Sequence, residues 1–307
     1  MPSKRRDERA PLGEHRARCH GNICEGMLTF DEFAAQKVLE AATANIGRLT
    51  TVFDSRDTSR VRGIGNAWSR LHYGGDFSLV CPDQTQTAVS LVFIQTKDGN
   101  TGGPNPGGFG GGATDKHLIY EGLSRVAADA VLGGAGSVHR HAFFSVWRPE
   151  LVALRTSLGL PRHPVQIVVS KRGSVDLDAL LFNVPDVPVV LIAGDECVGR
   201  HGPALRARPW MRTIFWDSDD LRPVFERLRM EEGIQRISAI GGRSTATKLV
   251  DAGLIQDLYL TTTSRDAGEP GTPWYCGAHS PPMTAITSKE WSENGSRVAF
   301  DHLVIGA

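Results

Sequence analysis

Two glycine pairs lie where short apolar segments end and small polar residues begin. One is in AVLGGAGSV, residues 130–138, and the other is in SAIGGRSTA, residues 238–246. Glycine allows a ligand to approach the backbone closely, and the free N–H groups at a helix start favour a phosphate. Side chains that can donate to a phosphate belong to these segments: Ser137, Arg243, Ser244 and Thr245. The segments therefore predict a phosphate-binding cradle, with a plain strand-to-helix turn as the alternative.

The elements that must position these turns alternate from residue 85 onward. Strands are expected over residues 87–96, 129–136, 164–170, 187–194, 212–216, 234–242 and 254–263, and helices over 114–127, 149–159, 219–233 and 244–253. Two further strands, residues 283–291 and 296–306, predict a closing antiparallel hairpin. This alternation predicts an α/β fold with a mostly parallel central sheet flanked by helices. Both glycine turns then lie at the carboxyl ends of parallel strands, where open sheets bind ligands.

Residues 1–84 are interpreted as an N-terminal extension of a single domain that covers residues 85–307. The arginine-rich residues 1–25 are expected to be disordered. Thr29 and Glu32 have the spacing of a capping box and predict a helix over residues 29–46. Residues 47–84 are rich in Gly, Arg, Asp and Ser, and we expect an irregular segment there.

Composition narrows the function classes. The 34 basic and 34 acidic residues balance, which argues against a nucleic-acid binder with a broad basic face. No apolar run approaches the roughly 18 residues of a membrane span, and the charged N-terminus lacks a signal-peptide core, so we expect a cytoplasmic protein. The five scattered cysteines do not indicate a disulfide framework, and Cys19 and Cys24 with their neighbouring histidines are too loosely spaced to predict a metal site.

Three further motifs follow one another along residues 85–307. Thr96-Lys97-Asp98-Gly99 ends the first strand, Ser124-Arg125 precedes a run from Ala128 to Gly133, and Ile240-Gly241-Gly242 precedes residues 252–257, AGLIQD. In this order they resemble the C-terminal reductase domain of riboflavin biosynthesis, a pyrimidine reductase family with the dihydrofolate reductase-like fold. Neither G-x-G-x-x-G in its strand–helix context nor a P-loop is present, which argues against a Rossmann dehydrogenase and a P-loop NTPase.

The resemblance implies NADPH as cofactor, a small-molecule substrate and a homodimer. The implied cofactor contacts are Ile94, Thr96, Gly133, Gly134, Ala135, Ser137, Val138, Gly241, Gly242, Arg243, Ser244, Thr245 and Ala246. Arg243 is the candidate reader of the extra phosphate of NADPH. The implied substrate contacts are Asp98, Arg125, Arg148 and Ile240, and Asp98 is also the candidate for handling the proton.

The chain departs from the family in two places. Ile240 stands where the family carries a glutamate that faces the substrate, and the zinc signature of the deaminase half does not occur. The expected activity is hydride transfer to a C=N or opened-sugar C=O of a pyrimidine-type substrate. The alternatives are a reductase recruited to a specialised metabolite, a non-catalytic NADP-binding or regulatory protein, and an unrelated transferase. Asp115 is interpreted as a helix cap rather than a catalytic acid.

Overall fold

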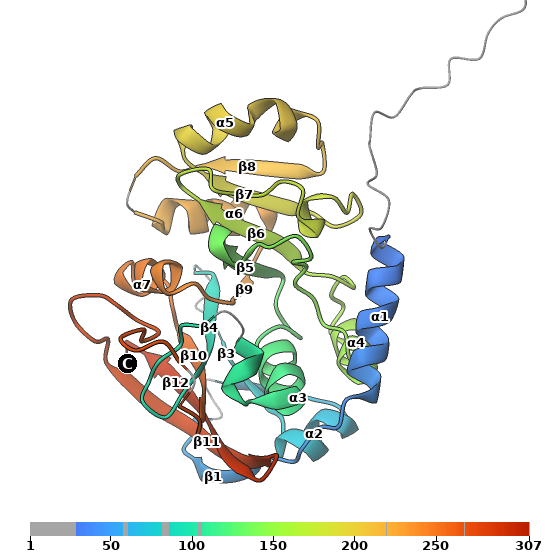
Figure 1. Cartoon of the computed structure of the whole chain (residues 1–307), viewed down its shortest axis with the longest axis vertical. Coiled ribbons are helices and arrows are strands. Elements are labelled where there is room, and N and C mark those ends of the chain that lie inside the picture. The colour runs from blue at the N-terminus through green and yellow to red at the C-terminus, as the bar shows by residue number, and fades with distance from the viewer. Residues whose placement is uncertain are drawn as a thin grey trace, which may run out of the picture.

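The fold is described from a computed structural model, which describes residues 29–57, 61–81, 86–103, 106–218, 220–266 and 268–306. The predicted disorder of residues 1–25 lies outside these residues. A ten-stranded sheet with the order β1-β11-β12-β10-β4-β9-β5-β6-β7-β8 forms the centre of the molecule, from β8 at the top of Figure 1 to β1 at the bottom. The predicted α/β fold is confirmed.

Neighbouring strands are parallel from β10 to β8 and antiparallel from β10 to β1. The parallel strands are β4 (Ala88–Gln95), β5 (Ala130–Gly134), β6 (Val165–Ser170), β7 (Val189–Ala193), β8 (Met211–Phe215), β9 (Arg236–Ala239) and β10 (Asp257–Thr263). The antiparallel strands are β1 (Thr50–Asp54), β11 (Met283–Glu293) and β12 (Ser296–Ile305). The expected closing hairpin is therefore confirmed. Its turn is Asn294-Gly295, and both residues have positive φ, as a tight hairpin turn requires.

Among the central strands, β5 and β7 carry no polar side chain, as expected where both faces of a sheet are covered. Val190 and Ile192 of β7 pack on one side with helices α6 (Arg222–Glu232) and α7 (Arg243–Asp251). Val189 and Leu191 pack on the other side, where α1 (Phe30–Thr43) and α5 (Asp195–Arg206) lie. The second face continues over β4 and β10, which are covered by α2 (Ala67–Tyr73), α4 (Pro149–Ser157) and the π-helix η2 (Asp115–Leu123).

Short elements complete the described chain. They are α3 (Gly112–Thr114), the 3₁₀-helices η1 (Pro106–Phe109), η3 (Ala135–Ser137) and η4 (Leu180–Phe182), and a two-stranded sheet of β2 (Val61–Ile64) and β3 (Phe77–Val80). Among the described residues, no helix combines the length and the hydropathy needed to cross a bilayer.

The N-terminal extension is more ordered than expected. The capping box of Thr29 and Glu32 is confirmed, although the helix ends at Thr43 rather than near residue 46. The expectation of an irregular segment over residues 47–84 is wrong for most of its described part, since β1 pairs with β11 at the edge of the main sheet and β2 pairs with β3. The exposed face of β1 explains why the sequence did not predict a strand there, because its residues show no buried–exposed alternation.

The helix expected over residues 114–127 also differs from the prediction. It starts as the single turn α3 and continues as the π-helix η2, a rare geometry that is frequent at functional sites. Asp115, the expected cap, is the first residue of η2 rather than its N-cap, and Thr114 at the N-cap position makes no capping hydrogen bond with its side chain. Instead, the hydroxyl of Thr114 accepts a hydrogen bond from the Gly47 N–H at 2.9 Å, and the carboxyl of Asp115 accepts one from the Thr261 hydroxyl.

Candidate active site

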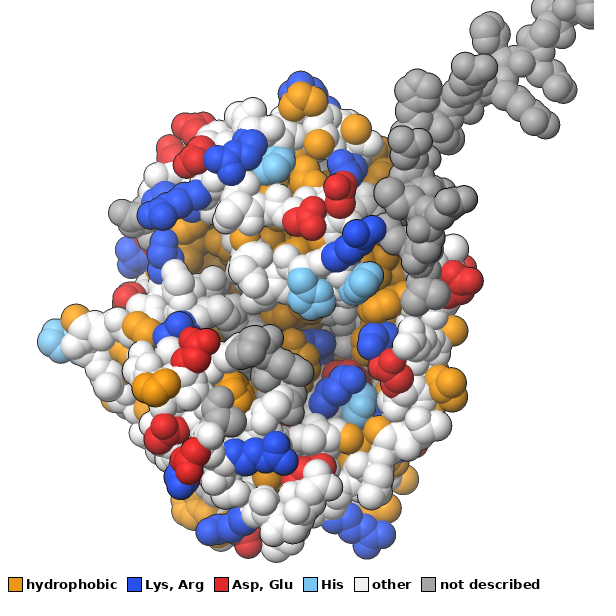
Figure 2. All heavy atoms as spheres, viewed as in Figure 1, with side chains coloured by type: hydrophobic (Ala, Val, Ile, Leu, Met, Phe, Trp, Pro, Cys, Tyr) orange, Lys and Arg blue, Asp and Glu red, His pale blue; other side chains and the backbone are white. Residues whose placement is uncertain are grey.

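A large cavity follows the carboxyl ends of the parallel strands. Its volume is about 2150 Å³, and its wall contains residues at the ends of β4, β9, β5, β6, β7 and β8. Figure 2 shows a hollow across the middle of the molecule in which hydrophobic side chains are visible. Pockets for one drug-sized ligand measure about 300–1,000 Å³, so this cavity has room for an extended ligand and a second molecule beside it.

The first glycine turn joins β5 to η3 and lies against the second turn. A Cβ atom on Gly134 would lie 2.7 Å from the Thr245 hydroxyl oxygen, so only glycine fits at this position without a shift of Thr245. Ala135 and Ser137 follow in η3 and line the cavity. The N–H groups at the start of η3 have no side-chain cap and can donate to a ligand.

The second glycine turn opens helix α7. Gly241 and Gly242 have φ values of 111° and 82°, which side-chain-bearing residues rarely adopt. Gly242 is the N-cap of α7 and supplies no side chain, so the first N–H groups of the helix are open to the cavity. A Cβ atom on Gly242 would lie 3.6 Å from the Thr245 hydroxyl oxygen and 3.9 Å from that of Ser137. The two hydroxyls therefore converge on this backbone, and the arrangement suits a pyrophosphate.

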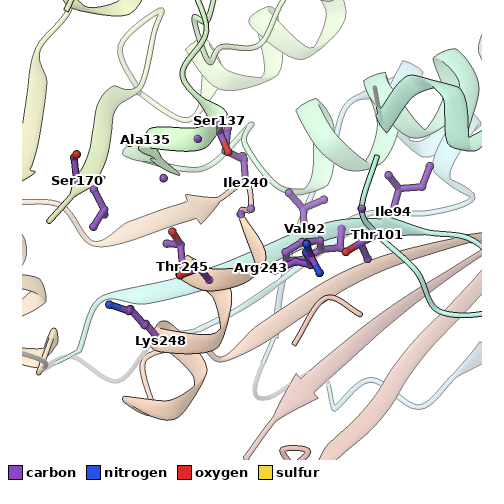
Figure 3. Close-up of a pocket in the computed structure, with 18 of the residues that line it drawn as sticks. Val92, Ile94, Thr101, Ala135, Ser137, Ser170, Ile240, Arg243, Thr245 and Lys248 are labelled. Atoms are coloured by element: carbon purple, nitrogen blue, oxygen red, sulfur yellow. The ribbon is translucent and has the colours of Figure 1, made fainter. Parts of the chain in front are cut away.

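Two basic side chains of α7 extend in opposite directions. Figure 3 shows Arg243 pointing toward Val92 and Thr101, while Lys248 points away from them. The Lys248 ammonium lies 5.2 Å from the centre of the Trp216 ring, at the end of the cavity beside β8. The Lys171 ammonium lies 5.0 Å from the same ring. The β6–β8 end of the cavity thus carries the ammonium groups of Lys171 and Lys248 together with the carboxylates of Asp195, Glu196 and Asp217, and Arg243 lies toward the β4 end.

Asp115 is an acidic group in the cavity wall beside Ile94 at the β4 end. A Cβ atom on Gly111 would lie 2.7 Å from both the Asp115 Cβ and the Ile94 Cδ1, so these two side chains meet at one point of the cavity wall. Burial raises the pKa of Asp115 from 3.8 to about 6, although the hydrogen bond from Thr261 lowers it in part. Asp115 can therefore hold a proton close to neutral pH, as a proton donor to a ligand must.

Ten of the residues predicted for the site line this cavity. They are Ile94, Gly134, Ala135, Ser137, Ile240, Gly241, Gly242, Arg243, Ser244 and Thr245. The other predicted residues are not among the described residues of the cavity wall. They are Thr96, Asp98, Arg125, Gly133, Val138, Arg148 and Ala246.

Asp98 lies in an exposed turn beyond β4. It accepts hydrogen bonds from the Thr96 hydroxyl and from the Asn100 side-chain amide. The hydrogen bond from Thr96 is the main reason why the pKa of Asp98 is lowered. An exposed carboxylate that stays ionised is a poor proton donor, so the geometry gives Asp98 a role in shaping the turn.

The two arginines predicted to contact the substrate are not part of the described cavity wall, and the Nε and Nη2 atoms of Arg125 are buried without a hydrogen-bond partner among the described residues. The Arg125 guanidinium lies behind the cavity wall, 3.7 Å from the ring centre of Tyr120, and donates to the Ser145 carbonyl at 3.1 Å. Arg148 donates to the carbonyls of Ala41 and Ala44 at 2.8 and 3.2 Å. Both side chains are buried, and Arg148 binds the C-terminal end of α1.

The remaining predicted residues support the cradle from behind. Val138 and Ala246 are buried in the cores on either face of the sheet. A Cβ atom on Gly133 would lie 3.4 Å from the Phe144 ring, which places this glycine against the core rather than the cavity.

Sequence reasoning missed several residues of the wall. The π-helix contributes Asp115, Lys116, His117 and Tyr120, and the extension contributes Glu40 and Ala44. The signal for Asp115 was present, because a carboxyl in the first turn of a helix beside a glycine-rich loop can cap the helix or face a ligand. Nothing in the sequence indicated that Lys248 and Trp216 belong to the cavity wall, because only the folded sheet brings β8 and α7 together.

The fold is similar to those of solved reductases. A pyrimidine reductase-like protein from Corynebacterium diphtheriae has a TM-score of 0.60 and 19% identity, with 73% of this chain and 93% of that chain covered. A diaminohydroxyphosphoribosylaminopyrimidine deaminase/5-amino-6-(5-phosphoribosylamino)uracil reductase from Thermotoga maritima has a TM-score of 0.51 and 16% identity. That match covers 72% of this chain and 57% of the longer Thermotoga protein. At these identities the likeness shows the fold.

Sequence comparison shows the family. Among curated proteins, no sequence matches the chain. The described residues before β4 form α1 to β3 and show no deaminase domain. The family model for the RibD C-terminal domain matches residues 88–300, which is more than half of the chain, and the chain therefore belongs to the RibD C-terminal domain family.

Proposed function

We propose that the protein is an NADPH-dependent reductase that transfers a hydride to a C=N or opened-sugar C=O of a small heterocyclic substrate. The observation that carries this proposal is the paired cradle of Gly134 and Gly242, in which two backbone turns and two hydroxyls converge at the uncapped start of α7. Such a cradle fits the pyrophosphate of a dinucleotide. Family membership and the reductase fold support the same reaction.

The cavity fits a dinucleotide that crosses the strand ends. Its pyrophosphate would lie between η3 and α7, and its nicotinamide beside Ile94 at the end of β4. The bound cofactor supplies the hydride, and the protein supplies orientation and the proton. Asp115 would donate that proton to the nitrogen or oxygen of the reduced bond, because its pKa of about 6 lies near the working range.

The adenosine half would lie toward β6, β7 and β8. Lys248 is our candidate for the extra phosphate of NADPH, with Lys171 as a second cation. We assign this role to Lys248 in place of Arg243, because Arg243 points to the other end of the cavity in Figure 3.

The substrate compartment supports a reductase with a specialised substrate as second candidate. Ile240 presents an aliphatic side chain to the cavity, Arg148 donates to backbone carbonyls at the end of α1, and Arg125 is not among the described residues of the cavity wall. These features favour a substrate that needs fewer charged contacts than the phosphoribosylamino pyrimidine reduced by riboflavin-pathway enzymes. By family resemblance we also propose a cytoplasmic homodimer, which size-exclusion chromatography with light scattering would test.

The function is tested by titrating the full-length protein with NADPH and NADH and then following oxidation of the bound nicotinamide. The first substrate to try is 5-amino-6-(5-phosphoribosylamino)uracil, followed by its unphosphorylated form and by cyclic imines. We expect NADPH to bind more tightly than NADH and at least one substrate class to be reduced. Absence of binding by both nucleotides would contradict the proposal, and binding without any turnover would favour the non-catalytic alternative.

A further inference from the structure

The N-terminal extension contacts the turn that carries Asp115. Residues 44–49, which we call the α1–β1 segment, run from the end of α1 to the start of β1. The Gly47 N–H donates a hydrogen bond of 2.9 Å to the hydroxyl oxygen of Thr114, the residue immediately before Asp115. Thr114 is buried, with 1% of its surface exposed, so this hydroxyl has protein rather than water around it.

Gly47 is fixed on its other side as well. Its carbonyl lies 3.2 Å from the Nδ1 atom of His72, and the His72 carbonyl accepts the N–H of Leu49 at 2.7 Å. A carbonyl oxygen only accepts hydrogen bonds, so the imidazole proton of this contact lies on Nδ1. An added Cβ atom on Gly47 would lie 3.2 Å from the Thr114 hydroxyl oxygen and 3.6 Å from Cδ1 of Trp291. A displacement of Gly47 toward these side chains would therefore displace Thr114.

The same segment packs in the core beneath η2 and reaches the cavity. Ile46 and Leu49 are buried and belong to one core cluster with Leu118 of η2. Ala44, at the start of the segment, lies in the cavity wall, as Asp115 does. The extension thus borders both the core side of the acid-bearing helix and the compartment into which the acid acts.

Proton donation requires the Asp115 carboxyl to keep one position. The Thr261 hydroxyl of β10 donates to the carboxyl, and the Asp115 N–H donates to the Gly111 carbonyl at 3.2 Å. Gly111 follows a run of glycines, which restrict the backbone less than other residues do. The hydrogen bond between Gly47 and Thr114 adds a fixed point outside this loop. A misplacement of about 1 Å can lower a reaction rate by about 100-fold, so such a fixed point matters for catalysis.

We propose that Gly47 and Thr114 are positioning residues for Asp115, through which the N-terminal extension takes part in proton donation during hydride transfer. This inference rests on the proposed function, in which Asp115 is the proton donor. The match to the family model begins at residue 88, so the contact joins a residue outside the family domain to the first turn of the helix that carries the acid. The extension is then a working part of the active site.

Two variants of the full-length protein disturb this contact from opposite sides. Thr114→Val removes the oxygen that accepts the Gly47 N–H and keeps the shape of the side chain. Gly47→Ala adds a methyl group 3.2 Å from the same oxygen and removes no polar group. Each should lower kcat by about 10- to 100-fold and keep the Kd of NADPH within about twofold, because neither change touches the phosphate cradle. Thr114→Ser, which keeps the hydroxyl, should restore most of the activity.

Two residues away from the cavity provide matched controls. A Cβ atom on Gly63, in β2 of the extension, would also lie 3.2 Å from a side chain, that of Asp76. Thr87 is buried like Thr114, and its hydroxyl donates to the Ile234 carbonyl at 3.3 Å. Neither residue is among the described residues of the cavity wall. Gly63→Ala and Thr87→Val should therefore keep kcat within about twofold of the wild-type value.

The ionisation of Asp115 gives a readout that does not depend on turnover. Burial is the main cause of its raised pKa of about 6, the Thr261 hydrogen bond lowers the pKa, and the charge of Glu293 on β11 raises it. A displaced carboxyl gains contact with water, so Thr114→Val and Gly47→Ala should lower this pKa. Titration of the carboxyl by ¹³C spectroscopy measures the shift, and Asp115→Asn identifies the signal. Thr114→Ser and the two controls should leave the pKa unchanged.

The outcomes separate positioning from a merely structural contact. A variant that only unfolds more easily would lose active protein without moving the pKa of Asp115. If Thr114→Val fails to fold, Gly47→Ala carries the test, because it leaves no polar group unpaired. Wild-type values of kcat and of the Asp115 pKa in the altered proteins would overturn the inference, and so would an equal loss of activity in Gly63→Ala.

Failure of the proposed function would show in the wild type, as absent nucleotide binding or absent turnover. The pKa of Asp115 still tests the positioning contact in that case. A lowered pKa in Thr114→Val and Gly47→Ala would support the contact between the extension and Asp115, and an unchanged pKa would contradict it.

Discussion

Replacing Asp115 with asparagine should stabilise the protein while it disables hydride transfer. The pKa of the Asp115 carboxyl is about 6 in the folded protein, whereas it has its ordinary value of 3.8 in the unfolded chain. The unfolded state therefore releases its proton at lower pH, and Asp115 costs stability as pH rises from about 4 to 6. At about 1.36 kcal/mol for each pH unit between the two pKa values, the cost is at most about 3 kcal/mol.

Asparagine removes this cost and keeps the contact. Its side-chain oxygen can accept the hydrogen bond of the Thr261 hydroxyl, as the carboxyl does now. Because the cavity is open to solvent, which screens part of the charge, we expect a gain of about 1–3 kcal/mol above pH 6. Urea unfolding of both proteins at several pH values measures it. The gain should shrink toward zero below pH 4, where both side chains are neutral.

The activity of Asp115→Asn, in contrast to its stability, should fall. Without a proton donor, the rate of hydride transfer in Asp115→Asn should fall by about 10²–10⁴-fold, with NADPH affinity unchanged. The wild-type rate should decline above pH 6, about tenfold per pH unit once Asp115 is largely ionised, and the variant should lack this decline. Asp98→Asn is the matched control, since Asp98 is exposed and outside the cavity wall. A variant that is less stable at pH 7.5, or a gain that does not depend on pH, would refute the reasoning.

Two further predictions concern the cofactor. Lys248→Ala should weaken NADPH binding by about 10- to 100-fold, the value of a hydrogen bond to a charged group, and should leave NADH binding unchanged. Arg243→Ala should weaken the binding of NADPH and NADH alike. Fluorescence titration measures both affinities, and equal losses of NADPH and NADH binding in Lys248→Ala would exclude a role of Lys248 at the extra phosphate. Gly134→Ala should weaken the binding of both nucleotides by about tenfold, because the new methyl group must displace the Thr245 hydroxyl 2.7 Å away. Gly133→Ala, whose new Cβ lies 3.4 Å from the Phe144 ring, should change the Kd by no more than about twofold. Similar Kd values for the two alanine variants would contradict the cradle.

Much of the parallel sheet was predictable because strands such as β5 and β7 are buried on both faces and read as short continuous apolar runs. The closing hairpin was predictable from Asn294-Gly295, which needs the backbone conformation of a tight turn. The extension was not predictable, since β1 is exposed along its length and its register with β11 depends on contacts far away in the sequence. The π-helix has no sequence signal that distinguishes it from an α-helix.

The position of the two glycine turns in the cavity wall could be predicted because glycine pairs at strand ends are visible in the sequence. The direction in which a side chain points could not be predicted from the sequence. Arg243 and Lys248 lie on one short helix, and only the path of α7 across the sheet decides which of them reaches the β8 end. Arg125 and Arg148 show the same limit, since a buried arginine with backbone partners and a substrate-binding arginine look alike in a sequence.

The contact between Arg148 and the end of α1 links ligand binding to the docking of that helix. Glu40 and Ala44 belong to the cavity wall, so a ligand that contacts them binds only the docked arrangement. Thermodynamic linkage then requires two free energies to be equal: the one by which the bound ligand stabilises the docked helix α1, and the one by which docking of α1 strengthens ligand binding. Amide protons of α1 should therefore exchange more slowly in the liganded protein. The N-terminal helix thus becomes a reporter of cavity occupancy that needs no knowledge of the substrate.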